Sequence, residues 1–124
     1  MKTLKFAGFL ILFFMLFYSF RNFFILSMVT GKYVNTNFEN SRTAEIPSHA
    51  DTLILFDDMT YKSSYYGGEG DYTLNYDFDG TEIHLTYEYQ FGKAGITRPM
   101  KRSFFGTIEI SLVPDLNQYY EKIE

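Results

Sequence analysis

The chain of 124 residues contains no cysteine, which excludes disulfide bonds, thiolate metal sites and thiol catalysis together. It also excludes the lipid-bearing cysteine of a bacterial lipoprotein, so any membrane anchor must be made of peptide. Basic residues are scarce: from residue 31 onward, eight Lys and Arg stand against fifteen Asp and Glu, a formal charge of −7. Nucleic-acid-binding surfaces need clustered positive charge, so we expect no nucleic-acid partner.

Sequence motifs of catalysis are missing as well. The chain has no Gly-x-Ser-x-Gly, and no grouping of Ser, His and Asp stands out. The glycine-rich residues 66–70 lie between two predicted strands, whereas a phosphate-binding loop joins a strand to a helix. His49 lies beside Asp51 in a polar stretch and is expected to be an exposed loop histidine. We therefore expect a protein that is not an enzyme and uses no cofactor and no metal.

The N-terminus carries a long apolar run. Residues 6–20 contain no charge, and after Arg21 and Asn22 the apolar residues resume up to Val29, which is long enough to cross a bilayer with tilt. Residues 27–31 match a signal-peptidase site poorly. We interpret residues 1–30 as a transmembrane signal anchor that contacts the lipid bilayer through residues 4–29, with a cleaved signal peptide as the alternative.

The charges around this run indicate an orientation. Lys2 and Lys5 precede it, and such residues favour the cytoplasmic side, whereas Arg21 and Lys32 on the other flank weaken the bias. We expect a single-pass protein of the cytoplasmic membrane whose C-terminal domain is exported.

Beyond residue 30 the apolar residues recur with a period of two, and turn signals follow at short intervals, which predicts an all-β domain over residues 31–124. The expected strands are residues 31–38, 52–56, 60–66, 71–78, 81–91, 103–113 and 118–123. Residues 39–51 and 92–101 are expected to be loops. In the strand at residues 52–56, apolar side chains occur at successive positions and so on both faces. We therefore expect this strand to be covered on both faces.

Asp79-Gly80 is the strongest short hairpin signal in the chain. A two-residue turn at this point would place Phe78 opposite Thr81, and apolar residues would then meet apolar residues along one face of the hairpin. In this register carboxylates also face carboxylates on the other face, which destabilises a ladder. These opposed pairs would be Asp77–Glu82 and Asp71–Glu88.

The polar face of this hairpin is the first candidate site. Its members are Asp71, Asp77, Glu82, His84 and Glu88. They alternate with residues that belong to the buried face, so we interpret them as a solvated wall of the domain. A docking surface for a basic protein partner and a metal site at His84 are the alternatives.

The opposite face is rich in tyrosine. With a turn at residues 67–70, Tyr66 would lie opposite Asp71, and the tyrosines of three neighbouring strands would share one face. Residues 103–113 would extend it through Phe104, Ile108, Ile110 and Leu112. Tyrosine suits both a barrel core and a groove for an apolar or peptide ligand. The candidate ligand-binding residues are Tyr65, Tyr66, Tyr72, Tyr87 and Tyr89.

Four short segments carry a resemblance: residues 31–34 (GKYV), 51–61 (DTLILFDDMTY), 70–72 (GDY) and 83–85 (IHL). Their spacing resembles the lipocalin-like domains of small bacterial envelope proteins. The resemblance implies an up-and-down antiparallel barrel or half-barrel with a binding or scaffolding role, and it transfers no catalytic residue. We expect a membrane-anchored binding module; the alternative is an acidic, immunity-type inhibitor of a basic toxin.

Overall fold

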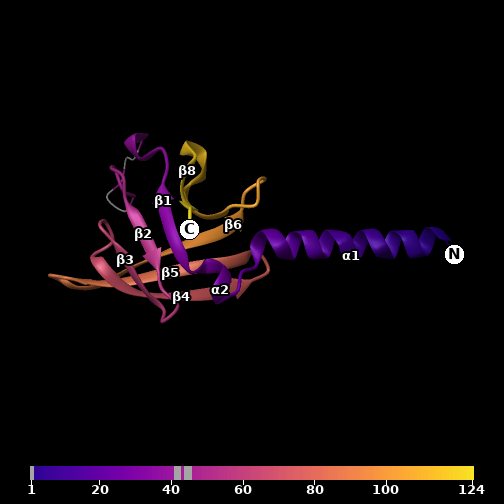
Figure 1. Cartoon of the computed structure of the whole chain (residues 1–124), viewed down its shortest axis with the longest axis horizontal. Helices are drawn as coiled ribbons and strands as arrows, with labels where there is room; N and C mark the ends of the chain where they lie inside the picture. The colour runs from indigo at the N-terminus through magenta and orange to yellow at the C-terminus, as the bar shows by residue number, and fades with distance from the viewer. Residues whose placement is uncertain (1, 41–42, 44–45) are drawn as a thin grey trace.

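The computed structural model describes residues 2–40, 43 and 46–124, and it shows eight antiparallel strands that close into a barrel in the order β1 to β8. One long helix precedes the barrel (Figure 1). The predicted fold class is thereby confirmed. The elements are α1 (Lys2–Asn22), α2 (Leu26–Val29), β1 (Gly31–Asn35), η1 (Phe38–Asn40), β2 (Thr52–Leu55), β3 (Thr60–Ser63), β4 (Gly68–Asp77), β5 (Gly80–Tyr89), β6 (Gly92–Arg102), β7 (Ile108–Val113), η2 (Pro114–Leu116) and β8 (Gln118–Lys122).

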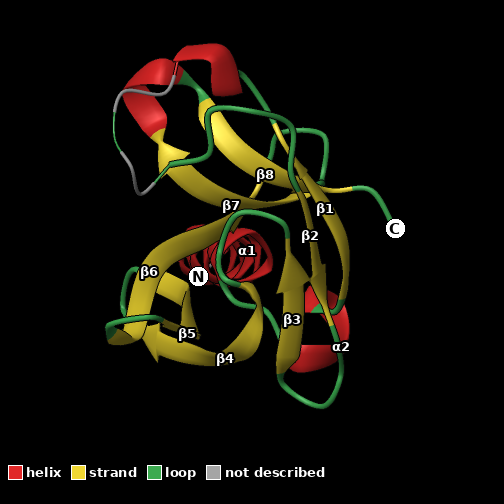
Figure 2. Ribbon diagram, turned by 90° about the vertical axis from the view of Figure 1, so that its left-hand side faces the viewer, coloured by secondary structure: helices red, strands yellow, loops and turns green. Residues whose placement is uncertain are grey.

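Because the strands run up and down, alternate connections gather at the two ends of the barrel. We call the end from which α1 leaves the proximal end; it holds α2 and the turns β2–β3, β4–β5 and β6–β7. The distal end holds the connections β1–β2, β3–β4, β5–β6 and β7–β8. Seen from the distal end, α1 points directly away behind the barrel (Figure 2).

Helix α1 has the length and composition to cross a membrane, and none of its residues is buried in the structure. Its 21 residues span about 32 Å at 1.5 Å per residue. The helix ends at Asn22, although the apolar run continues to Val29. Thr81 explains the break, because its hydroxyl donates to the carbonyl of Asn22 (2.8 Å) and accepts from the backbone N–H of Phe24 (3.1 Å).

The residues after this break close the proximal end of the barrel. Phe24 is 1% exposed and Val29 is fully buried, and both belong to the barrel core. The second half of the apolar run therefore packs against protein through Phe24 and Val29 while Ile25 stays exposed, and only α1 presents its side chains outward along its whole length.

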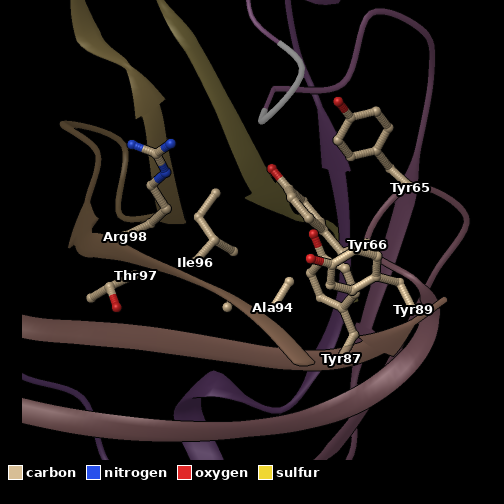
Figure 3. A pocket seen from close by; sticks show the side chains of 9 residues that line it. Tyr65, Tyr66, Tyr87, Tyr89, Ala94, Ile96, Thr97 and Arg98 are labelled. Atoms are coloured by element: carbon tan, nitrogen blue, oxygen red, sulfur yellow. The ribbon is translucent and has the colours of Figure 1, made fainter. Parts of the chain in front are cut away.

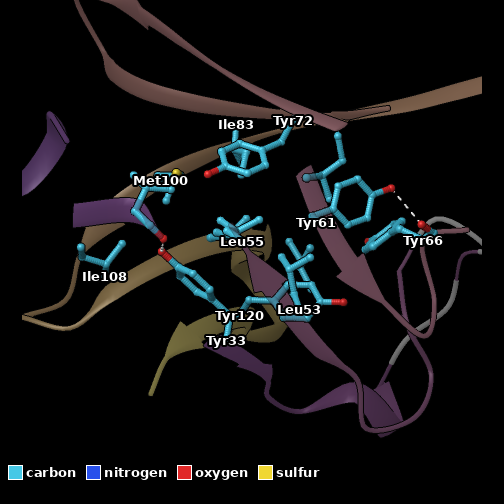
Figure 4. Close-up of a cluster of buried hydrophobic side chains, with 14 of the residues drawn as sticks. Tyr33, Leu53, Leu55, Tyr61, Tyr66, Tyr72, Ile83, Met100, Ile108 and Tyr120 are labelled. Atoms are coloured by element: carbon cyan, nitrogen blue, oxygen red, sulfur yellow. Dashed lines mark hydrogen bonds between the residues drawn. The ribbon is translucent and has the colours of Figure 1, made fainter. Parts of the chain in front are cut away.

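Inward-facing residues of every strand fill the barrel. Tyr33, Tyr61, Tyr72 and Tyr120 are each no more than 1% exposed, and their rings interleave with aliphatic side chains (Figure 4). Strand β2 alternates, with Leu53 and Leu55 buried and Thr52 exposed, so the expectation of cover on both faces was wrong. Of the tyrosines predicted to share one face, Tyr61 and Tyr72 are thus core, as small barrels require, whereas Tyr76 and Tyr89 are about half exposed.

Three of the buried tyrosines donate their hydroxyl groups to backbone carbonyls. Tyr33 donates to the carbonyl of Val29, Tyr72 to that of Phe56 and Tyr61 to that of Tyr66. Burial raises the pKa of Tyr72 to about 12, with Asp58 and Asp57 adding to the effect. Burial likewise raises the pKa of Tyr33 and Tyr61 above that of a free tyrosine. These groups therefore stay neutral donors at physiological pH.

Two predicted hairpin registers were wrong by an even number of residues. In the β4–β5 hairpin Asp77 pairs with Gly80, so the turn is Phe78-Asp79. The Asp77 carboxylate accepts from the backbone N–H of Asp79 (2.9 Å) and of Gly80 (3.2 Å), which fixes this turn one position earlier. Since the shift is even, every side chain keeps its predicted face.

The β3–β4 connection differs in the same way. Strand β3 ends at Ser63, and Asp71 pairs with Thr60, so the turn precedes Gly68. Residues 64–67 form the turn, although residues 64–66 were expected to be the last part of the strand. Further along, residues 92–101 were expected to be a loop and are instead the greater part of β6. At residues 103–107 the chain turns, and Phe104, expected on the buried face, is 93% exposed.

Candidate functional site

The distal end of the barrel is organised around one buried carboxylate. Asp51, 4% exposed, lies directly before β2. It accepts hydrogen bonds from the hydroxyl of Ser63 (2.7 Å), from the backbone N–H and the hydroxyl of Ser64, and from the hydroxyl of Tyr120. Three elements, β2, the β3–β4 turn and β8, are thereby held together. Burial, followed by the hydrogen bond and charge of Asp51, raises the pKa of Tyr120 far above its usual range.

This carboxylate positions the two tyrosines of the β3–β4 turn. The Ser63 hydroxyl, held by Asp51, accepts from the backbone N–H groups of Tyr65 and Tyr66 (3.1 Å each). Gly67 follows with φ +73°, and a Cβ there would come within 2.7 Å of the Tyr87 ring. The turn therefore packs its backbone against β5, and only glycine permits the approach.

A groove of about 520 Å³ lies beside this turn. Four tyrosines line one side of it, and the first half of β6 lines the other, with Arg98 farthest from the tyrosines (Figure 3). The rings of Tyr65 and Tyr66 meet edge to face at 5.0 Å, and Tyr66 lies 6.3 Å from Tyr87. We call this the tyrosine groove; its lining is Tyr65, Tyr66, Tyr87, Tyr89, Ala94, Gly95, Ile96, Thr97 and Arg98.

The floor of the tyrosine groove separates it from the barrel interior. Tyr66, Ile96 and Arg98 line both the groove and the interior cavity. That cavity measures only about 10 Å³, too little for more than one water molecule. Burial raises the pKa of Tyr66, while the positive charge of Arg98 acts in the opposite direction. A ligand of this groove would thus lie across the end of the barrel and not inside it.

Strand β6 brings an unpaired edge to the same place. It pairs with β5 from Gly92 to Met100 but with β7 only from Met100 to Arg102. Over residues 92–99, no strand among the described residues pairs with its second edge. Alternate residues of an antiparallel strand point their N–H and C=O groups away from the paired neighbour, so this stretch offers hydrogen-bonding groups to an additional strand.

Four of the five candidate ligand-binding tyrosines gather at this groove: Tyr65, Tyr66, Tyr87 and Tyr89. Tyr72 does not, because it is buried in the core and its hydroxyl reaches the carbonyl of Phe56 at the proximal end. The sequence interpretation missed Ile96 and Arg98, since residues 92–101 were taken as a loop. Their signal was present: Ala94, Ile96 and Met100 alternate with polar residues, and Gly95 and Pro99 obscured the pattern. Pro99 is tolerated because β6 has an unpaired edge there.

The five candidates of the acidic face do not form one cluster. Asp71 pairs with Thr86, Glu82 with Asn75 and His84 with Thr73, so the expected opposition of carboxylates is absent. Asp77 lies at the proximal turn, whereas Glu88 lies near the distal end and faces Lys93 of β6. The five residues are at least partly exposed on the outer wall of the barrel.

The histidines have polar neighbours rather than metal-ligand partners. His84 Nδ1 lies 2.6 Å from the hydroxyl of Thr97, and His49 is exposed with Nδ1 3.4 Å from the hydroxyl of Ser48. In the part of the chain that the structure describes, no three His, Asp or Glu side chains are grouped so that they could hold a metal ion.

Comparisons of the chain with protein-family models, with curated proteins and with solved structures find no match. The geometry of the tyrosine groove is therefore the basis of the functional argument.

Proposed function

We propose that the protein is a membrane-anchored, non-enzymatic binding module whose tyrosine groove takes an extended peptide by strand addition. The single observation that carries this proposal is the coincidence of the unpaired edge of β6 with the groove. Addition of a strand to a free sheet edge supplies main-chain hydrogen bonds, and neighbouring pockets select alternate side chains of the peptide.

The side chains of the groove suggest what the peptide carries. The tyrosine rings offer flat apolar surface with polar tips, which suits an aromatic or aliphatic side chain. Among the described residues that line the groove, Arg98 is the only charged one, and its guanidinium group matches a carboxylate. We therefore propose a peptide with one apolar side chain and one acidic group, spaced to reach the tyrosines and Arg98 together.

The same lining supports binding and not chemistry. None of the described residues that line the groove carries a carboxylate, an imidazole or a thiol, so this part of the chain supplies no general base or nucleophile of the usual kind there. Asp51 is nearby, but all of its partners are hydroxyl and backbone groups of the barrel.

The proposed setting is the cell envelope. Helix α1 would cross the cytoplasmic membrane with Lys2 and Lys5 on the cytoplasmic side, and the lipocalin-like barrel would be exported. Because the tyrosine groove is at the distal end, it would open away from the bilayer, where a peptide or an exposed segment of another envelope protein is accessible.

The test is selection of peptides by the full-length protein in lipid nanodiscs. A displayed library of random twelve-residue peptides is enriched on the wild-type protein, with empty nanodiscs as the background. We expect enriched peptides to combine an apolar and an acidic residue. Arg98→Gln should weaken a selected peptide about tenfold or more, since hydrogen bonds to charged groups contribute roughly 1.5–3 kcal/mol.

Matched variants separate the groove from the outer wall. Tyr65→Ala and Tyr87→Ala should also reduce the affinity, whereas Lys93→Gln, on the outer face of the same strand, should not. Failure to enrich any peptide above empty nanodiscs would contradict the proposal. Salt-sensitive binding of a basic protein that is weakened by Glu82→Lys or Glu88→Lys, and not by Arg98→Gln, would instead support the inhibitor alternative.

A further inference from the structure

Three phenylalanines stand almost fully in solvent at the proximal end of the barrel. Phe78, at the tip of the β4–β5 turn, is 96% exposed. Phe104 and Phe105, at the tip of the β6–β7 turn, are 93% and 90% exposed and meet edge to face at 5.5 Å. Ile25 and Met28, beside the α1–β1 connection, add further exposed apolar surface at this end.

Hydrogen bonds tie both turns to the last part of α1. The hydroxyl of Tyr18 donates to the carbonyl of Phe78. Arg102, the last residue of β6, donates to the carbonyl of Phe20 (3.1 Å) and to that of Gly106 (3.0 Å), and so links α1 to the β6–β7 turn. Arg21 donates in return to the carbonyl of Arg102.

Arg102 also packs against the helix. Its guanidinium carbon lies 4.1 Å from the centre of the Phe20 ring and 5.3 Å from that of Phe24. A cation at this place also suits the negative end of the helix dipole. These bonds hold the β4–β5 and β6–β7 turns against the last part of α1, which adjoins the barrel in Figure 1.

The length of α1 sets where this level lies. A helix of 21 residues spans about 32 Å, close to the roughly 30 Å of a bilayer's hydrocarbon core. If α1 crosses the membrane, its last turn lies at the boundary between hydrocarbon and headgroups. Aromatic side chains concentrate at this boundary in membrane proteins.

We propose that Phe78, Phe104 and Phe105 insert into the interfacial layer of the bilayer that α1 crosses, so that the proximal end of the barrel is seated on the membrane. The occupant of this apolar surface is thus the lipid of the same bilayer. The proposal rests on the proposed membrane anchorage, but not on the peptide ligand. The β5–β6 turn at the distal end offers the contrast, since its Phe91 is 79% exposed at the end of the barrel opposite to α1.

The absence of cysteine makes the test direct, because one introduced cysteine gives one label. An environment-sensitive fluorophore is attached in separate full-length chains at Phe105→Cys, at Phe91→Cys as the aqueous control and at Leu12→Cys as the hydrocarbon control. The chains are reconstituted in phosphatidylcholine and phosphatidylglycerol nanodiscs with or without nitroxide-labelled lipids. We expect the label at 105 to be quenched by shallow nitroxides, the label at 12 by deep ones, and the label at 91 by aqueous iodide alone.

A second variant tests whether the phenylalanines hold the β6–β7 turn in the interfacial layer. The label at 105 is repeated in a chain that also carries Phe78→Ser and Phe104→Ser, all at exposed positions. Quenching by shallow nitroxides should fall several-fold; unchanged quenching would overturn the proposal, because the helix alone would then hold the turn in place.

The other possible outcomes of the labelling experiment would each overturn the proposal. If the label at 12 lies in hydrocarbon but the label at 105 behaves like that at 91, the anchorage stands and the seating on lipid is overturned. If the label at 12 is not reached by deep nitroxides, both fail. Protection of the label at 105 from lipid and aqueous quenchers alike would show that a second copy of the chain covers the turns, which also overturns the proposal.

Discussion

The two ends of the barrel use aromatic residues in different ways. At the proximal end Phe24 closes the core, and Phe78, Phe104 and Phe105, which have no polar atom, stand outside it. At the distal end the aromatic residues around the groove are tyrosines, whose rings carry hydroxyl groups. A ring without a polar atom suits contact with lipid, and a ring with a hydroxyl suits a groove that exchanges water for a ligand.

Strand pairing follows the same division. The ladder between β6 and β7 closes the barrel at the proximal end, at Met100–Arg102, and is absent along the distal part of β6. The distal connections are instead joined by polar contacts, among them the hydrogen bonds to the Asp51 carboxylate and those from Thr36 and Asn37 to the carbonyl of Asn117. The proximal end thus combines the buried ring of Phe24 with hydrogen bonds to α1, whereas the distal connections depend on polar contacts, and each set can be removed separately.

Alkaline pH should have the largest effect and should act on both ends. Five buried tyrosines, Tyr33, Tyr61, Tyr66, Tyr72 and Tyr120, have a raised pKa in the folded protein. Their stabilisation is complete below the unfolded pKa near 10 and is lost as the pH rises toward the folded values, about 12 for Tyr72. Each tyrosine should lower the free energy of unfolding by about 1.4 kcal/mol per pH unit in this range.

Urea unfolding between pH 8 and 11.5, followed by circular dichroism, measures this slope. Tyr33→Phe removes one hydroxyl near the proximal end, and Tyr61→Phe removes one near the distal end. Each substitution should reduce the pH dependence of the free energy of unfolding by the contribution of one tyrosine. A slope unchanged by either substitution would contradict the assignment of the pH dependence to buried tyrosines.

Removal of the Phe24 ring, which closes the proximal end of the barrel, should have the next largest effect on stability. Phe24→Ala deletes a ring that is 1% exposed and should lower the free energy of unfolding by about 3–5 kcal/mol. The neighbouring Ile25 is 61% exposed, so Ile25→Ala is the matched control and should change stability by no more than about 0.5 kcal/mol. Equal losses in the two variants, measured by urea unfolding in detergent, would show that Phe24 does not close the barrel.

Loss of the hydrogen bonds to the Asp51 carboxylate should have a smaller and more local effect on stability. Asp51→Ala leaves the hydroxyls of Ser63 and Tyr120 without their acceptor and should lower stability by roughly 2–3 kcal/mol. Hydrogen exchange should increase at the backbone N–H groups of Tyr65 and Tyr66, and not at the proximal turns. Asp57→Ala, at an exposed turn of the proximal end, is the control and should leave both quantities near the wild-type values.

The sequence predicted the wall of the barrel better than its ends, for physical reasons. The alternation of apolar and polar residues shows which face of the sheet a side chain occupies. Because both registers were wrong by an even number of residues, the predicted faces were still correct. Turns depend on single hydrogen bonds, such as those of Asp77 with Asp79 and Gly80. The groove was only partly predictable, because Ile96 and Arg98 lie on a strand whose pattern Gly95 and Pro99 interrupt.

Charge reversals on the outer wall of the barrel should have the smallest effect on the free energy of unfolding. The sign of this effect distinguishes the predicted from the observed register of β4 and β5. In the predicted register Glu88 would face Asp71, so Glu88→Lys would replace a repulsion by an attraction and stabilise the protein. In the structure Glu88 faces Lys93, so the same substitution should destabilise it by about 0.2–1 kcal/mol.

Glu82→Lys is the matched control for this experiment. Glu82 faces the uncharged Asn75 on one side and Pro99 on the other, so the change should be close to zero, whereas the predicted register would pair the new lysine with Asp77 and stabilise the protein. Urea unfolding at low salt measures both variants, and the differences should shrink at high salt because exposed charges are screened. Stabilisation by both substitutions would overturn the observed pairing of β4, β5 and β6.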